Sequence, residues 1–145
     1  MALQDLKIAP SIFVGLGGCG SQIVDEIGRK VKQNEDMYSR YKNLLHFFAF
    51  DTDMNQLTDC HYVDGRFPMA LSRFDKPKFV EHQFGAMGVP ENNIFTQWWP
   101  EFYRPRDVPG AVGAGQIRLE SRLSIFYTLQ YSPNFDRAIS NAIRR

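Results

Sequence analysis

The sequence has few cysteines, little net charge and no long apolar run, and each shortage excludes a class of protein. Two cysteines, Cys19 and Cys60, are too few for a disulfide framework, so we expect two free thiols in a reducing compartment. With 17 Lys and Arg against 16 Asp and Glu, the formal charge is +1, which gives no broad field for attracting nucleic acid or an anionic membrane. Any recognition of phosphate must therefore be local.

The apolar runs are also short. The longest, residues 12–16 and 47–50, fall far below the roughly 20 residues that a membrane-spanning helix needs. Residues 1–7 lack the basic stretch followed by an apolar one that marks a signal peptide. We therefore expect a cytoplasmic protein with no membrane span and no nucleic-acid partner.

What the sequence does contain is the pattern of a strand, a helix and a second strand. Residues 11–16 predict a strand buried on both faces. From Ser21 the apolar residues recur at helical spacing, as Ile23, Val24, Ile27 and Val31. Residues 33–43 are polar and predict a surface connector, and residues 44–50 predict a second buried strand. Such a βαβ unit implies parallel strands and a right-handed crossover.

A glycine-rich loop, residues 15–21, lies between the first strand and the helix. Gly15, Gly17 and Gly20 fit the spacing G-x-G-x-x-G, with a predicted strand before them and a predicted helix after them. Unpaired N–H groups at the start of a helix, together with the helix dipole, bind phosphate without a basic side chain. The alternative is a tight turn with no ligand, but four glycines in six positions exceed what turning needs.

Two acidic residues follow the second strand at the same edge of the sheet. Asp51 or Asp53 has the position to bind a ribose hydroxyl, or to act through water on a magnesium ion. The alternative is that one of them caps a following helix around residues 55–57. The spacing leaves these roles open.

The middle of the chain has no clear period. Residues 60–109 contain six prolines among aromatic and charged residues, and predict an insertion of loops and short helices. Residues 110–115 form a second glycine-rich turn that leads into a predicted helix over 119–130, and residues 135–145 also read as helical. Cys60, His61 and His82 match no common zinc spacing, so no metal bound directly by side chains is expected.

Three segments resemble the loops of one known family. Residues 17–23, Gly-Gly-Cys-Gly-Ser-Gln-Ile, resemble the first phosphate loop of tubulins, Gly-Gln-Cys-Gly-Asn-Gln-Ile, and the glycine-richer loop of FtsZ. Residues 48–53, with Gln56 and Leu57, resemble the second loop of FtsZ, where the strand runs into Asn-Thr-Asp. Residues 113–115, with Arg122 seven positions on, resemble the third loop, which in that family reaches the terminal phosphate. The chain is thus similar to the tubulin and FtsZ superfamily, most of all to its bacterial tubulin-like proteins.

This resemblance implies an α/β fold, a Rossmann-like parallel sheet with flanking helices, in which residues 1–145 are the N-terminal half of a tubulin/FtsZ-type GTPase domain. It also implies GTP or GDP as ligand, Mg²⁺ reached from Asp53 through water, and GTP hydrolysis with self-association into filaments by a full-length protein. The family's fourth loop, guanine-binding segment and acidic loop do not occur before Arg145, so we expect an incomplete GTPase domain. No catalytic residue is assigned. The residues expected to contact the nucleotide are Gly15, Gly17, Gly18, Cys19, Gly20, Ser21, Gln22, Asp51, Thr52, Asp53, Gly113, Ala114 and Gly115.

Three other functions fit parts of this pattern. In an NAD-binding Rossmann oxidoreductase, an acidic residue follows the last glycine by about 20 positions, whereas Asp51 lies 31 positions beyond Gly20 (51 − 20). An adenylyltransferase of the ubiquitin-activating type has a similar glycine loop, but its Asn-Arg-Gln cluster after the second strand is missing. A nucleotide-binding scaffold without hydrolysis ranks second to the GTPase.

Overall fold

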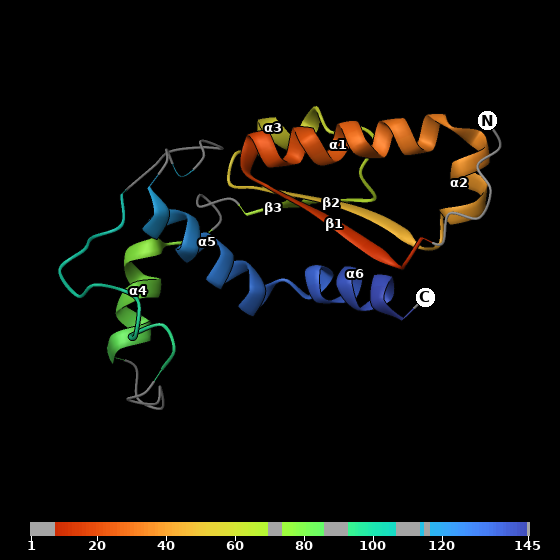
Figure 1. Ribbon diagram of the computed structural model, residues 1–145. Coiled ribbons are helices and arrows are strands. Elements are labelled where there is room, and N and C mark those ends of the chain that lie inside the picture. Colours follow the sequence, from red (N-terminus) through yellow and green to blue (C-terminus); the bar gives the residue numbers. More distant parts are fainter. Residues whose placement is uncertain (1–7, 70–73, 86–92, 107–113, 115–116, 145) are drawn as a thin grey trace.

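Among the described residues, three parallel strands form one sheet, with helices packed on it (Figure 1). They are β1 (Ser11–Leu16), β2 (Leu45–Asp51) and β3 (Gly65–Pro68), in the order β1-β2-β3. This computed structural model describes residues 8–69, 74–85, 93–106, 114 and 117–144. The parallel α/β sheet expected from the sequence is confirmed.

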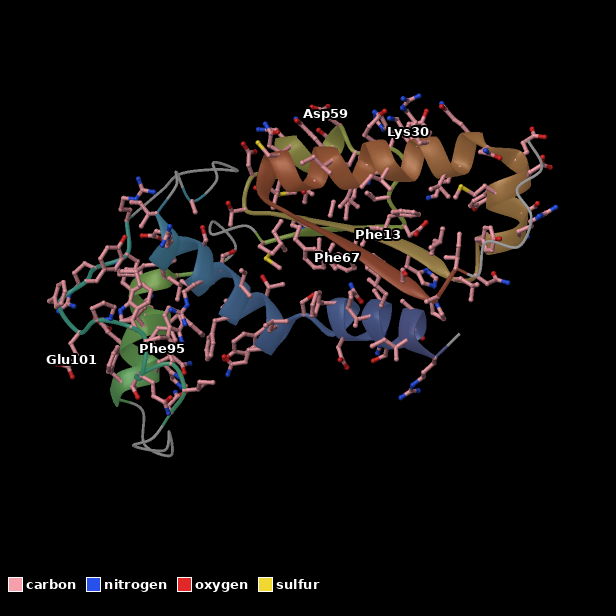
Figure 2. The ribbon with its side chains drawn as sticks, viewed as in Figure 1. Phe13, Lys30, Asp59, Phe67, Phe95 and Glu101 are labelled. Atoms are coloured by element: carbon pink, nitrogen blue, oxygen red, sulfur yellow. The ribbon has the colours of Figure 1, made fainter. Side chains whose placement is uncertain are left out.

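Helices cover both faces of the sheet. Helix α1 (Gly17–Gln33) and the short α3 (Met54–Thr58) lie on one face, and α6 (Pro133–Ile143) lies on the other, as Figure 1 shows. Successive side chains of a strand point to opposite faces, so Phe47 packs with α1 while Phe48 and Phe50 pack with α6. In Figure 2, Phe13 and Phe67 mark these two layers of the core.

Two elements differ from the sequence-based expectations. The expected connector at residues 33–43 contains helix α2 (Glu35–Tyr41), which buries no residue and therefore has no apolar period to detect. Asn34 caps it by accepting a hydrogen bond from Met37 N, 3.0 Å away. The segment 60–109, expected to hold loops and short helices, also contains a strand that the sequence did not indicate: β3, which has four residues and ends in a proline. The first helix itself begins at Gly17 rather than Ser21.

A second hydrophobic core lies beyond the sheet. It packs α4 (Lys76–Gly85) and the turns of residues 93–106 against α5 (Arg118–Tyr131). We call this group the aromatic cluster; its buried members are Phe79, Val80, Phe95, Trp99 and Leu123. Figure 2 shows Phe95 among these side chains, next to α4. Helix α5 also reaches the sheet's own core through Ile125, and its Ser124 hydroxyl donates to the carbonyl of Met69.

Both cysteines are free thiols, as expected, with Cys19 exposed and Cys60 buried. None of the helices in the described ranges is long and apolar enough to cross a membrane. Along β1, at the edge of the described sheet, Ile12, Val14 and Leu16 are exposed on one face.

The start of α1 lies unusually close to β1. A Cβ atom added to Gly15 would come within 2.4 Å of the carbonyl oxygen of Gly20, a separation that real Cβ atoms do not reach. One added to Gly20 would in turn lie 3.4 Å from the carbonyl carbon of Gly15. The two glycines therefore pack backbone against backbone, and this contact sets how closely the helix approaches the strand.

Replacing Gly15 by alanine is expected to lower the free energy of unfolding by about 1–3 kcal/mol, because the helix and the strand must move apart to admit the methyl group. Urea denaturation followed by circular dichroism measures this change. The control is Gly85→Ala at the end of α4, where the added Cβ meets no atom within 4 Å. The control should match the original chain or be up to about 1 kcal/mol more stable. Equal unfolding midpoints for both variants would contradict the packing argument.

Candidate functional site

The glycine loop and the acidic segment meet at one edge of the sheet. Strands β1 and β2 are parallel and in register, with Leu16 beside Phe50, so the residues that follow them emerge side by side. Gly17 starts α1 at this point, and Asp51 ends β2. Ligands of open parallel sheets bind at the carboxyl ends of the strands, and this is the edge where both segments lie.

The first turn of α1 keeps its backbone amides free of side-chain caps. Its N-cap residue is Leu16, which has no side-chain acceptor and makes no capping bond. Gly17 has a φ angle of +73°, a left-handed conformation that favours glycine, and a Cβ added there would meet nothing within 4 Å. Unsatisfied N–H groups with open space before them form a place where an anion can bind.

The loop residues divide into two groups. Gly17, Gly18, Cys19 and Gln22 are at least partly accessible. Gly18 lies near the side chain of Gln56, whose Oε1 atom would be 3.2 Å from an added Cβ and accepts a hydrogen bond from Gln22 Nε2 at 3.5 Å.

Gly15, Gly20 and Ser21 form the inward-facing group. Ser21 is fully buried, and its hydroxyl donates to the carbonyl of Phe50 at 3.4 Å. Gly15 and Gly20 pack on each other. These three residues fasten the helix to the sheet, although Gly20 is itself partly accessible, and the outward group lies at the surface.

Asp51 and Asp53 have different roles. Asp53 caps α3, since its Oδ1 atom accepts a hydrogen bond from Asn55 N at 2.9 Å. This is the capping role that the sequence analysis gave as the alternative to ligand binding. Asp51 is only 7% exposed, and its Oδ1 atom accepts from Asp53 N at 2.9 Å. Its Oδ2 atom is buried and has no partner within the described part of the chain. A buried carboxylate oxygen without a donor calls for a ligand or water to supply one.

The third loop reaches the same edge through a single described residue. Ala114 is buried, and its N–H donates to Thr52 Oγ1 at 3.0 Å, across 62 positions of the sequence. Gly113 and Gly115, expected in the same loop, lie outside the described residues. The structure thus places Thr52 and Ala114 together.

Three residues that support this edge were not among the expected nucleotide contacts: Gln56, which was noted only in the resemblance to the second loop, Arg106 and Glu120. Gln56 lies beside Gly18, and Arg106 Nη2 donates to the carbonyl of Ala114 at 2.8 Å. Glu120 is fully buried although it lies among the charged residues at the start of α5. The sequence did offer one sign that Glu120 is buried, since it lies between the apolar Leu119 and Leu123 of the same helix. Only the fold shows which groups its carboxylate contacts.

The two thiols near this edge differ in their surroundings. Burial raises the pKa of the Cys60 thiol, which is 1% exposed and lies 3.6 Å from the carbonyl oxygen of Gln56. Cys19 is exposed in the first turn of α1. Over the described residues, no three His, Cys, Asp or Glu side chains gather as ligands for a metal ion. The edge therefore offers amide donors for an anion and one carboxylate acceptor for a hydroxyl or a hydrated cation.

Comparison with known proteins gave one match. A family model described as tubulin-like matches residues 12–145, nearly the whole chain. No curated protein and no solved structure matched. The matched range includes all three loops, together with β2, where the unpaired carboxylate oxygen lies. The chain belongs to the tubulin-like family.

Proposed function

We propose that this protein binds GTP or GDP at the carboxyl edge of its sheet, with the phosphates on the first turn of α1. One observation carries the proposal: uncapped amides at Gly17 and Gly18 lie at the same edge as the unpartnered Oδ2 atom of Asp51. The amides suit phosphate oxygens, and the carboxylate oxygen suits a sugar hydroxyl or a water molecule held by Mg²⁺. Guanine as the base follows from family membership.

Mg²⁺ fits this edge as an ion held through water. Asp53 was expected to reach it, but the Oδ1 atom of Asp53 caps α3, whereas Asp51 has a buried Oδ2 atom that lacks a partner among the described residues. We therefore propose Asp51 as the acceptor that faces the ion's water shell or the ribose, with Asp53 beside it. Gly113 and Gly115 remain proposed contacts to the phosphates, together with Ala114.

The proposal extends to hydrolysis of GTP and self-association by a full-length cytoplasmic protein of bacterial type, and this extension rests on the family alone. The second candidate is a scaffold that binds nucleotide without hydrolysing it. Its support is that both carboxylates at this edge bind backbone N–H groups. Asp51 accepts a hydrogen bond from the N–H of Asp53, and Asp53 accepts one from the N–H of Asn55. The Oδ2 atom of Asp51 can still accept a hydrogen bond from a ligand, but no residue at this edge is assigned as the base that would activate water.

Gly18→Val is expected to weaken GDP binding at least tenfold while the protein stays folded, because the side chain would occupy the space of a phosphate but meet only the flexible end of Gln56. Titration calorimetry with GTP, GDP and NAD measures the affinities. Gly85→Val on α4 is the matched control and should bind as the original chain does. Binding of NAD with no response to guanine nucleotides would favour the oxidoreductase instead.

Asp51→Asn tests the unpartnered oxygen. The substitution keeps an acceptor for Asp53 N but removes the negative charge that faces the ligand. Hydrogen bonds to charged groups contribute about 1.5–3 kcal/mol, so GDP affinity should fall by roughly 10- to 100-fold. Asp53→Asn, which keeps a good capping residue, should change affinity far less. Equal losses in the two variants would show that Oδ2 of Asp51 has no special role.

Bound nucleotide should protect Cys19 from alkylation. Its thiol is exposed in the first turn of α1, where we place the phosphates, whereas Cys60 is buried and its raised pKa disfavours the reactive thiolate. Mass spectrometry after treatment with iodoacetamide follows both sites. We expect GDP to slow modification of Cys19 and to leave Cys60 unmodified throughout. Unchanged labelling of Cys19 at saturating GDP would place the nucleotide elsewhere.

A further inference from the structure

A chain of hydrogen bonds connects the aromatic cluster to the carboxyl edge of the sheet. It starts at Tyr103, whose ring packs edge-on against Trp99 with centroids 5.3 Å apart. The Tyr103 hydroxyl donates to Glu120 Oε1 at 2.9 Å, and the backbone N–H of Arg106 donates to the same oxygen at 2.8 Å. Glu120 thus fixes both ends of the segment from Tyr103 to Arg106.

From this anchored position Arg106 reaches the third loop. Its Nη2 atom donates to the carbonyl of Ala114 at 2.8 Å, while the Ala114 N–H donates to Thr52 Oγ1 at 3.0 Å. Ile117 N also donates to the Ala114 carbonyl, at 3.2 Å. Both polar backbone groups of Ala114 are therefore held, one by the end of β2 and the other in part by a side chain from the inserted region.

Glu120 holds this segment at a cost. It is fully buried, and its Oε2 atom has no partner among the described residues, and burial of a polar atom without a partner is unfavourable. Burial, followed by the adjacent Glu120, raises the pKa of Tyr103, which keeps the phenol protonated and able to donate. Packing of α5 alone needs no carboxyl group here. A glutamate is needed here because two groups, the Tyr103 hydroxyl and the Arg106 N–H, require an acceptor.

We infer that Arg106 is a positioning residue for the nucleotide site: held by Glu120, it fixes the Ala114 backbone against Thr52, so that the aromatic cluster sets the position of Ala114 at the edge of the sheet. This rests on the proposed function only for the identity of the ligand. The contacts themselves belong to the unliganded chain. Residues 93–106 thereby acquire a role at a site formed by the sheet.

Two measurements on the full chain test this inference. The first is hydrogen exchange of the Ala114 amide, followed by nuclear magnetic resonance without ligand, and the second is GDP affinity by calorimetry. Arg106→Ala should speed exchange at Ala114 and weaken GDP binding, each by about tenfold, as expected for loss of one charge-assisted bond. Arg106→Lys keeps a donor and should recover part of both. Because Arg106 is exposed, its loss should leave the melting temperature nearly unchanged.

Arg104→Ala is the matched control. It removes the same charge two residues away, from a guanidinium that donates to the carbonyl of Glu101 and makes no hydrogen bond to Ala114 among the described residues. It should change neither measurement. A general loss of positive charge would instead affect both variants alike.

The outcomes separate this inference from the proposed function. Unchanged exchange at Ala114 in Arg106→Ala would overturn the inference, whatever the protein binds. Faster exchange with unchanged GDP affinity would also overturn it, because Arg106 would then hold Ala114 in place without affecting nucleotide binding. Faster exchange in a protein that binds no guanine nucleotide would support the positioning of Ala114 and refute the proposed ligand.

Discussion

The contact between the backbones of Gly15 and Gly20 is the constraint on which the site depends. It allows α1 to start immediately after β1 and to lie directly against it, so that the first amides of the helix stand at the sheet's edge. Ser21 secures the same approach from the next position, through its bond to the carbonyl of Phe50. Any side chain inserted between helix and strand would tilt those amides away from β2 and from Asp51.

The sequence predicted the elements whose signals are local. Strand β1, helix α1 and strand β2 each have a period or an apolar run of their own, so residues 11–33 and 44–51 could be assigned with small errors at the ends. Helix α2 has no buried face and β3 has only four residues, so neither leaves a period long enough to recognise. The glycine spacing correctly located the loop, but it could not tell which glycines face a ligand and which face the strand.

The site was predictable to the same extent. Resemblance to a family brought together three loops, and the fold places Thr52 and Ala114 in contact as that order requires. The resemblance could not distinguish Asp51 from Asp53, because the two residues differ in which backbone N–H donates a hydrogen bond to each carboxylate. Arg106 and Glu120 were missed because their partners lie 8 to 17 positions away in a region without a period.

The presence of two cores has a consequence for how the protein opens. The sheet with α1 and α6 forms one set of buried contacts, and the aromatic cluster forms another, with α5 shared between them. Sets of this kind can unfold as separate cooperative units with different free energies. If the aromatic unit opens first, Ala114 loses the bond from Arg106 while α1 still presents its amides. The protein would then pass through a partly unfolded state that keeps one wall of the proposed nucleotide site and has released another. Heat or denaturant would weaken binding at that site in steps before the sheet itself is lost.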